Sequence, residues 1–145
     1  MIARGIDAVE VGQSAVYETA VLLGDVFEFA SLSGDHHPQH TDAAYASATR
    51  FGERIAHGAL LVAYMSAAFT QYWERWLRGR TAQPAVSYGY DRVRFIKPVR
   101  FGDRLKVEHR IARIDAPEHK AFAEVTVTNQ QGETVAAATH IVKFV

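Results

Sequence analysis

Residues 58–69 read GALLVAYMSAAF and form the longest apolar stretch of the chain. Its apolar side chains surround the axis of a helix instead of forming one stripe, which is typical of a helix buried on every side. At its end, Arg78 suits the negative end of a helix dipole, and Gly79 can adopt the left-handed conformation that ends helices. The sequence therefore predicts a buried helix of about 20 residues, roughly 30 Å long.

Segments rich in Val, Ile, Phe and Tyr lie on both sides of this helix and are typical of strands. They cover residues 14–21, 87–96, 103–114, 121–128 and 134–145, with a turn at 129–132, while about 42–77 reads as helical. Antiparallel strands around one long apolar helix predict an α+β fold. We expect a single domain over residues 1–145, with an antiparallel sheet wrapped around a long central helix.

The composition excludes several classes of function. Lys plus Arg and Asp plus Glu are 16 each, so no strong field attracts nucleic acid or an anionic membrane. The chain has no cysteine, which excludes disulfides, thiolate metal sites and cysteine nucleophiles. The N-terminus does not resemble a signal peptide, and the apolar stretch is too short to span a bilayer. We therefore expect a cytoplasmic protein with no nucleic-acid or membrane partner.

The segment at residues 33–42, SGDHHPQHTD, carries the candidate catalytic side chains. Gly and Pro predict irregular backbone, in which functional side chains are often presented by a rigid scaffold. Asp35 and His40 lie five residues apart across the turn at Pro38, so their side chains can converge on one small volume. Such a pair can orient one water molecule and exchange protons with it, and an ordinary histidine pKa of about 6.5 suits this role.

A second segment, FGERIAHG at residues 51–58, leads directly into the long helix. The N–H groups of a first helical turn have no intrahelical partner and lie at the positive end of the helix dipole. Gly58 has no Cβ, so a ligand oxygen can approach the backbone closely. We therefore expect the Gly58 N–H to stabilise an oxygen that gains negative charge.

Together the two segments resemble the MaoC-like family of hotdog proteins, which includes R-specific enoyl-CoA hydratases and hydroxyacyl dehydratases. The family pattern is roughly Ser/Thr-Gly-Asp-x-Asn-Pro-x-His-x-Asp, then Tyr-Ala, then Phe-Gly-x-x-Ile-Ala-His-Gly. The chain matches it at Ser33, Gly34, Asp35, Pro38, His40, Asp42, Tyr45, Ala46, Phe51, Gly52, Ile55, Ala56, His57 and Gly58. The likeness continues through residues 92–99 and covers most of the chain.

The resemblance implies reversible hydration of a trans-2-enoyl thioester, from coenzyme A or an acyl carrier, to the R-3-hydroxyacyl thioester. It implies that Asp35 and His40 hold the water, with the formal base left open, and that the Gly58 N–H contacts the thioester oxygen. Ser66 falls where related hydratases carry a supporting serine. Such proteins need no metal or other cofactor, and they form homodimers or higher homo-oligomers by joining two sheets edge to edge.

Several alternatives stay open for individual residues. His37 stands where the family has Asn, which affects pH optimum and substrate preference more than reaction class. His57 is interpreted mainly as a structural residue at the helix entry, with a role in ordering the acyl site as the alternative. For the cluster of histidines and aspartates in the loop, the alternative to a catalytic role is a zinc or iron site. Its ligands would be His36, His37, His40, Asp35 and Asp42.

Two further alternatives concern the basic strand and the activity as a whole. Arg92, Arg94 and Lys97, in a basic patch with Arg100 and Arg104, either cover a solvated strand face or contact the phosphates of coenzyme A. Because side chains alternate along a strand, only some of these five residues can contact the phosphates. The rival activities are a hotdog thioesterase and a non-catalytic acyl-thioester-binding subunit of a heteromeric dehydratase.

Overall fold

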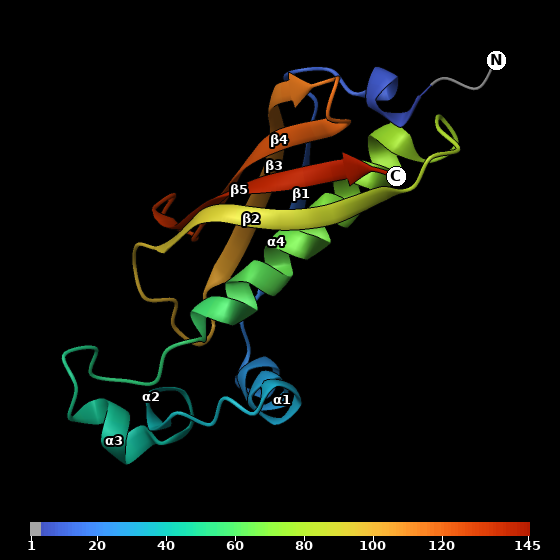
Figure 1. The fold of residues 1–145 in the computed structure, drawn as a ribbon. Coiled ribbons are helices and arrows are strands. Elements are labelled where there is room, and N and C mark those ends of the chain that lie inside the picture. Colours follow the sequence, from blue (N-terminus) through green and yellow to red (C-terminus); the bar gives the residue numbers. More distant parts are fainter. Residues whose placement is uncertain (1–3) are drawn as a thin grey trace.

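A single antiparallel sheet curves around one long helix in the computed structural model, which describes residues 4–145 (Figure 1). The elements are a 3₁₀ turn η1 (Gly5–Ala8), strands β1 (Ser14–Ala20), β2 (Ala85–Phe95), β3 (Arg104–Asp115), β4 (Lys120–Thr128) and β5 (Thr134–Phe144), helices α1 (Leu23–Ser33), α2 (Pro38–Thr41), α3 (Ala43–Ser47) and α4 (Gly58–Tyr72), and a π-helical turn η2 (Trp73–Leu77). The predicted α+β arrangement is confirmed.

The sheet has the order β1-β3-β4-β5-β2, and all of its pairings are antiparallel. All five predicted strands are present, with bounds that differ by at most two residues. Alternation along β4 buries Val125 and Val127 against α4 and turns Glu124 outward, as its sequence pattern predicts. Strand β2 forms one edge, and most of its residues are exposed on both faces.

Helix α4 begins at Gly58, as predicted, and its last turn continues as η2. Gly79 follows with a φ of 74°, the left-handed conformation expected for a helix end. The face toward the sheet is fully buried and includes Met65 and Tyr72. The opposite face carries Ala59, Ala63 and Ser66, which are exposed, so the prediction of burial on every side is wrong for the single chain.

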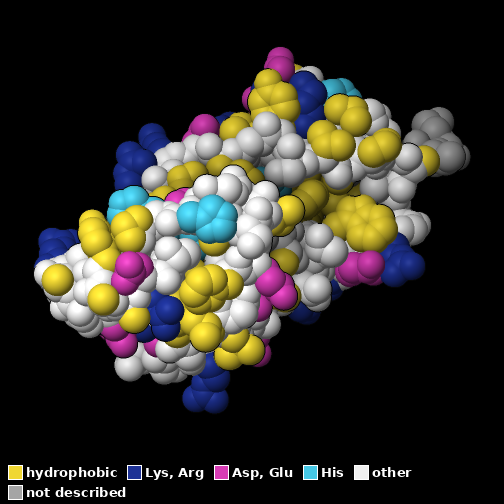
Figure 2. Space-filling view, turned by 90° about the horizontal axis from the view of Figure 1, so that it is seen from below, with side chains coloured by type: hydrophobic (Ala, Val, Ile, Leu, Met, Phe, Trp, Pro, Cys, Tyr) yellow, Lys and Arg dark blue, Asp and Glu magenta, His cyan; other side chains and the backbone are white. Residues whose placement is uncertain are grey.

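Helices α1 to α3 extend away from the sheet and α4 as a separate layer (Figure 1). Helix α1 was not predicted from the sequence, and the helical interpretation of residues 42–77 is wrong for 48–57, which are irregular. Tertiary pairing holds this loop, because the Ala56 N–H donates to the Val99 carbonyl at 2.8 Å. Figure 2 shows exposed hydrophobic side chains at this end of the molecule. In the part of the chain described, no helix is long and apolar enough to cross a membrane.

Two histidines are completely buried between α4 and the sheet. His109 Nε2 and His140 Nδ1 are 2.9 Å apart, and His140 Nε2 lies 2.7 Å from the Ser87 hydroxyl. Burial lowers the pKa of His109 to about 3, with the neighbouring His140 as a second cause, and lowers the pKa of His140 to about 4. Both imidazoles are therefore neutral in the folded protein at neutral pH.

This pair predicts a loss of stability in mild acid. In the unfolded chain both histidines have an ordinary pKa of about 6.5, so the unfolded state binds protons first and the free energy of unfolding falls as the pH drops from about 7 toward 4. At pH 5 the expected loss is on the order of 2 kcal/mol per histidine. Urea unfolding at pH 7.5 and pH 5 measures it. The variant H109Q, with one imidazole fewer, should show a flatter pH dependence, and an unchanged slope would contradict this origin.

Candidate active site

The loop that carries Asp35 is shaped by the ends of two helices. Gly34 ends α1 in the left-handed conformation with a φ of 82°, and its N–H donates to the Ala30 carbonyl. His37 then caps α2, because its Nδ1 accepts from the Gln39 N–H at 3.1 Å. The turn between them is tightened by Asp35 Oδ1, which accepts from the His37 N–H at 3.2 Å. His37, which stands where the family has Asn, thus caps the helix as an Asn side chain could also do.

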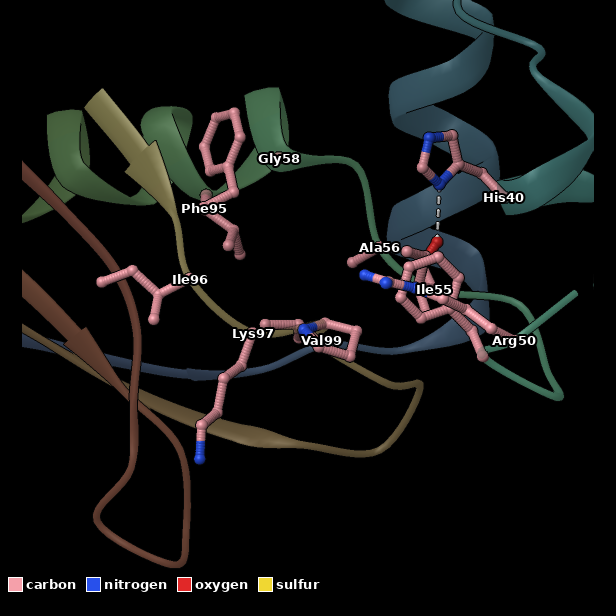
Figure 3. Close-up of a pocket in the computed structure, with 12 residues that line it drawn as sticks. His40, Arg50, Ile55, Ala56, Gly58, Phe95, Ile96, Lys97 and Val99 are labelled. Carbon is pink, nitrogen blue, oxygen red and sulfur yellow. Dashed lines mark hydrogen bonds between the residues drawn. The ribbon is translucent and has the colours of Figure 1, made fainter. Parts of the chain in front are cut away.

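His40 lies in α2 with a defined proton arrangement. Its Nδ1 is 2.7 Å from the Ile55 carbonyl oxygen, which can only accept, so Nδ1 carries the proton and Nε2 carries a free lone pair (Figure 3). Partial burial lowers the pKa of His40, assisted by His57 and His37, against the raising effects of the Ile55 carbonyl and Asp35. The neutral form of His40 therefore persists into mildly acidic solution.

Asp35, His40 and His57 bring three polar atoms together. One carboxylate oxygen of Asp35 and one ring nitrogen of each histidine all lie within 4.8 Å of one another. Two groups that hydrogen-bond to the same water at ~2.8 Å are roughly 4.5 Å apart when the water is tetrahedral. The predicted convergence of Asp35 and His40 is present, and a separation of at most 4.8 Å is compatible with one bridging water.

The same three residues are the kinds of ligand that zinc or iron binds, but they differ from the set considered from the sequence. His37 caps α2, and Asp42 caps α3 by accepting from the Tyr45 N–H at 3.0 Å. The rings of His40 and His57 lie 3.9 Å apart at 30°. Because His40 Nδ1 and His57 Nε2 donate to the carbonyl oxygens of Ile55 and Asp35, only the other nitrogen of each ring could ligate a metal ion in this arrangement.

A cavity of about 260 Å³ opens beside His40. Its wall contains the N-terminus of α4 and apolar side chains, and the lining residues include Ile55, Gly58, Leu61, Phe95, Ile96 and Val99. No acceptor for the Gly58 N–H is found within residues 4–145, as expected for a first helical turn. A Cβ on Gly58 would stand 2.5 Å from the Phe95 ring, so a larger residue at this position would have to displace that ring (Figure 3).

The remaining predicted residues are distributed unevenly around this cavity. Lys97 lines it at the end opposite His40 and pairs with Glu133 (Figure 3). Arg92 lines another cavity with Asp91 and Arg113, and the Arg94 guanidinium donates to the neighbouring Val93 carbonyl. Neither arginine lines the cavity of His40, so the structure does not bring the three basic residues together.

Ser66 also lies apart from the dyad. It is exposed on α4 and does not line the cavity, because eight residues of helix place it roughly 12 Å from Gly58 along the axis. Arg50 was missed in the sequence, although it lines the cavity with its guanidinium 5.0 Å from the Phe51 ring centroid. Its position directly before the Phe51-Gly52 motif is the signal that could have identified it.

The capping contact of His37 gives a stability prediction. The variant H37A removes the acceptor for the Gln39 N–H and should lower the free energy of unfolding by about 1 kcal/mol. The variant H37N restores an acceptor and should unfold within about 0.5 kcal/mol of the wild type, since Asn is among the best capping residues. Urea unfolding at pH 7.5 measures both. Equal stability of H37A and the wild type would show that the cap contributes nothing.

The comparison with protein families agrees with this geometry. The family model described as a MaoC-like domain matches residues 8–136. The chain therefore belongs to the MaoC-like family, and the family resemblance seen in the sequence is confirmed. Its sheet and central helix are the hotdog fold of that family's R-hydratase members.

Three relatives place the chain more narrowly within the family. It is 30% identical to an (R)-specific enoyl-CoA hydratase of Rhodospirillum rubrum over 135 residues, which covers 93% of this chain and 88% of that protein. It is 32% identical to a 3-hydroxybutyryl-CoA dehydratase of Methylorubrum extorquens over 126 residues, 87% of this chain and 74% of that protein. The solved structure of an unliganded R-hydratase of Pseudomonas aeruginosa superposes with a TM-score of 0.80 at 35% identity, covering 97% of this chain and 84% of the other.

Proposed function

We propose that this protein is a hydro-lyase that reversibly hydrates a trans-2-enoyl-CoA to the R-3-hydroxyacyl-CoA. The observation that carries the proposal is the convergence of Asp35 and His40 within 4.8 Å, which allows both to bind one water molecule, beside a cavity that is lined by His40 and Gly58. The names of the relatives support the reaction and favour coenzyme A as the carrier. They are hydratases and a dehydratase, which disfavours a thioesterase or a non-catalytic subunit.

The protonation state of His40 suggests how the water is added. The Asp35 carboxylate accepts one hydrogen of the water, and His40 Nε2 accepts the other, because Nδ1 already donates to the Ile55 carbonyl. As the oxygen attacks the β-carbon, the thioester oxygen gains charge and is stabilised by the Gly58 N–H. His40 then returns the proton to the α-carbon, so that one OH and one H are added in total.

The cations of the site have roles in binding. Lys97 and Arg50 both line the cavity, and a guanidinium or ammonium group favours the phosphates of coenzyme A. The structure gives Arg92 and Arg94 less support in this role, since they lie away from the cavity. Ser66 has support only from the family resemblance, because its side chain is exposed outside the cavity.

We also propose a homodimer. The edge strand β2 has unpaired backbone groups along one side, which makes it a template for a further strand. The exposed face of α4 carries Ala59, Ala63 and Ser66, which are small and mostly apolar, as suits close contact with another protein surface. A cytoplasmic location stays a prediction of the sequence.

Crotonyl-CoA tests the reaction class. The enoyl absorbance should fall while no free thiol is released, because hydration leaves the thioester intact. Thiol release in step with the absorbance change would identify a thioesterase. Saturable binding of crotonyl-CoA without any change in absorbance would identify a binding subunit.

A further inference from the structure

His57 is the residue on which the three parts of the proposed site converge. It directly precedes Gly58 at the start of α4, and its side chain is only 1% exposed. Its ring lies between that of Phe29 on α1, at 4.8 Å, and that of His40 on α2, at 3.9 Å. One side chain thus touches α1 and α2 while its backbone leads into α4.

The hydrogen bond of His57 fixes the backbone of Asp35. His57 Nε2 lies 2.9 Å from the Asp35 carbonyl oxygen, which can only accept, so Nε2 carries a proton and donates it. His57 Nδ1 is buried and finds no hydrogen-bond partner among residues 4–145. Among the described residues, the Nε2–H is therefore the one polar contact of this ring, and it is made to the backbone of Asp35.

We propose that His57 is a positioning residue that fixes Asp35 and His40 relative to the N-terminus of α4. Its Nε2–H holds the backbone from which the Asp35 side chain extends, and its ring limits the orientation of the His40 ring through the stacked contact. Both effects act through other residues and need no contact with substrate. The proposal rests on the proposed function, since the groups that His57 positions are those that hold the water.

The alternative is that His57 only fills space, and two variants separate these roles. The variant H57F keeps a ring between Phe29 and His40 but removes the donor to the Asp35 carbonyl. The variant H57Q removes the ring but retains a side-chain N–H that can reach that carbonyl. If His57 only fills space, H57F should be close to wild type and H57Q should be impaired through lost packing.

The first measurement is steady-state hydration of crotonyl-CoA by both folded variants. Loss of positioning should lower kcat of H57F by about 10–10²-fold with KM within about threefold, since a misplacement near 1 Å can cost 10²-fold in rate. H57Q should recover part of the lost kcat. A kcat of H57F within twofold of an active wild type would overturn the proposal.

The second measurement does not depend on activity and therefore separates this proposal from the proposed function. Nitrogen NMR of the imidazoles at pH 7.5 should show the wild-type His40 ring with its proton held on Nδ1. H57Q, which lacks the ring that contacts His40, should show a mixture of both neutral tautomers, while H57F should stay close to the wild type. An unchanged His40 tautomer in H57Q together with unchanged kcat in H57F would overturn the positioning role. If H57F fails to fold, H57Q and H57A decide. A kcat of H57Q between those of H57A and the wild type supports the role of the donor to the Asp35 carbonyl, and equal kcat values of H57Q and H57A contradict it.

Discussion

Replacing His40 by alanine is expected to lower kcat for crotonyl-CoA hydration by about 10²–10⁴-fold, the contribution of a well-placed general acid–base group. His40 Nε2 is the free ring nitrogen beside the cavity, and the variant H40A removes the only imidazole that lines it among the described residues. The fold should survive, because His40 is only half-buried and its single side-chain hydrogen bond is to the Ile55 carbonyl. The rate at which the enoyl absorbance falls, followed in the steady state or by stopped flow, measures the loss of kcat.

A matched control for H40A is available in the same loop. His36 is exposed, and its ring makes no hydrogen bond within the part of the chain that the structure describes. The variant H36A should therefore keep wild-type kcat and KM. Equal losses in H36A and H40A would show that the loop is sensitive to any change, and undiminished activity of H40A would remove His40 from the mechanism.

The second large effect is expected for Asp35. The variant D35N keeps an oxygen that can accept from the His37 N–H, so the turn should form as before. It removes the negative charge that orients the water and favours a transient proton on His40, which Asp35 stabilises by raising the pKa of His40. We expect kcat to fall by at least about 10²-fold with little change in the free energy of unfolding.

The control for D35N is the same chemical change at a neighbouring carboxylate. Asp42 caps α3 through the Tyr45 N–H, and Asn caps helices equally well, so D42N should retain both stability and activity. Circular dichroism and urea unfolding report the fold of each variant. If D35N turned over crotonyl-CoA at the wild-type rate, Asp35 would be a turn-forming residue and the dyad would be wrong.

The main lines of the fold were predictable because local pattern and tertiary structure agree. The apolar run from Gly58 is a helix because its long inner face packs on the sheet, and the alternation of Val125 and Val127 matches a strand with one buried face. The proximity of Asp35 and His40 to the start of α4 could be predicted only from the family motif. No periodicity links residues that far apart in sequence.

Helix α1 was missed because its apolar residues do not mark a face. Only Val26 and Ala30 are buried, while Leu23, Phe27 and Leu32 are exposed on the single chain. A helix whose apolar side chains point both inward and outward has a weak helical period. The loop at 48–57 was misread as helical because its structure depends on pairing with a distant segment, as the Ala56 contact to Val99 illustrates.

The finer features of the site depend on three-dimensional contacts that spacing does not reveal. The ring contact of His57 with His40 and the hydrogen bond of His57 to the Asp35 carbonyl join residues from two separate segments. Arg92 adopts a φ of 53° at an irregularity of β2 between Asp91 and Arg94. Such a bulge changes the facing of strand residues, so alternation could not assign the basic side chains to the cavity.

The most direct test of the central claim is the chirality of the product formed from crotonyl-CoA. We expect a single enantiomer, because Asp35 and His40 hold the water on one side of the bound enoyl group while the Gly58 N–H fixes its thioester oxygen. The proposed function requires this product to be R-3-hydroxybutyryl-CoA. The purified wild-type protein, with the H40A variant as the inactive reference, is sufficient for chiral analysis of the product. Formation of the S isomer, or no hydrated product from the wild type, would contradict the account.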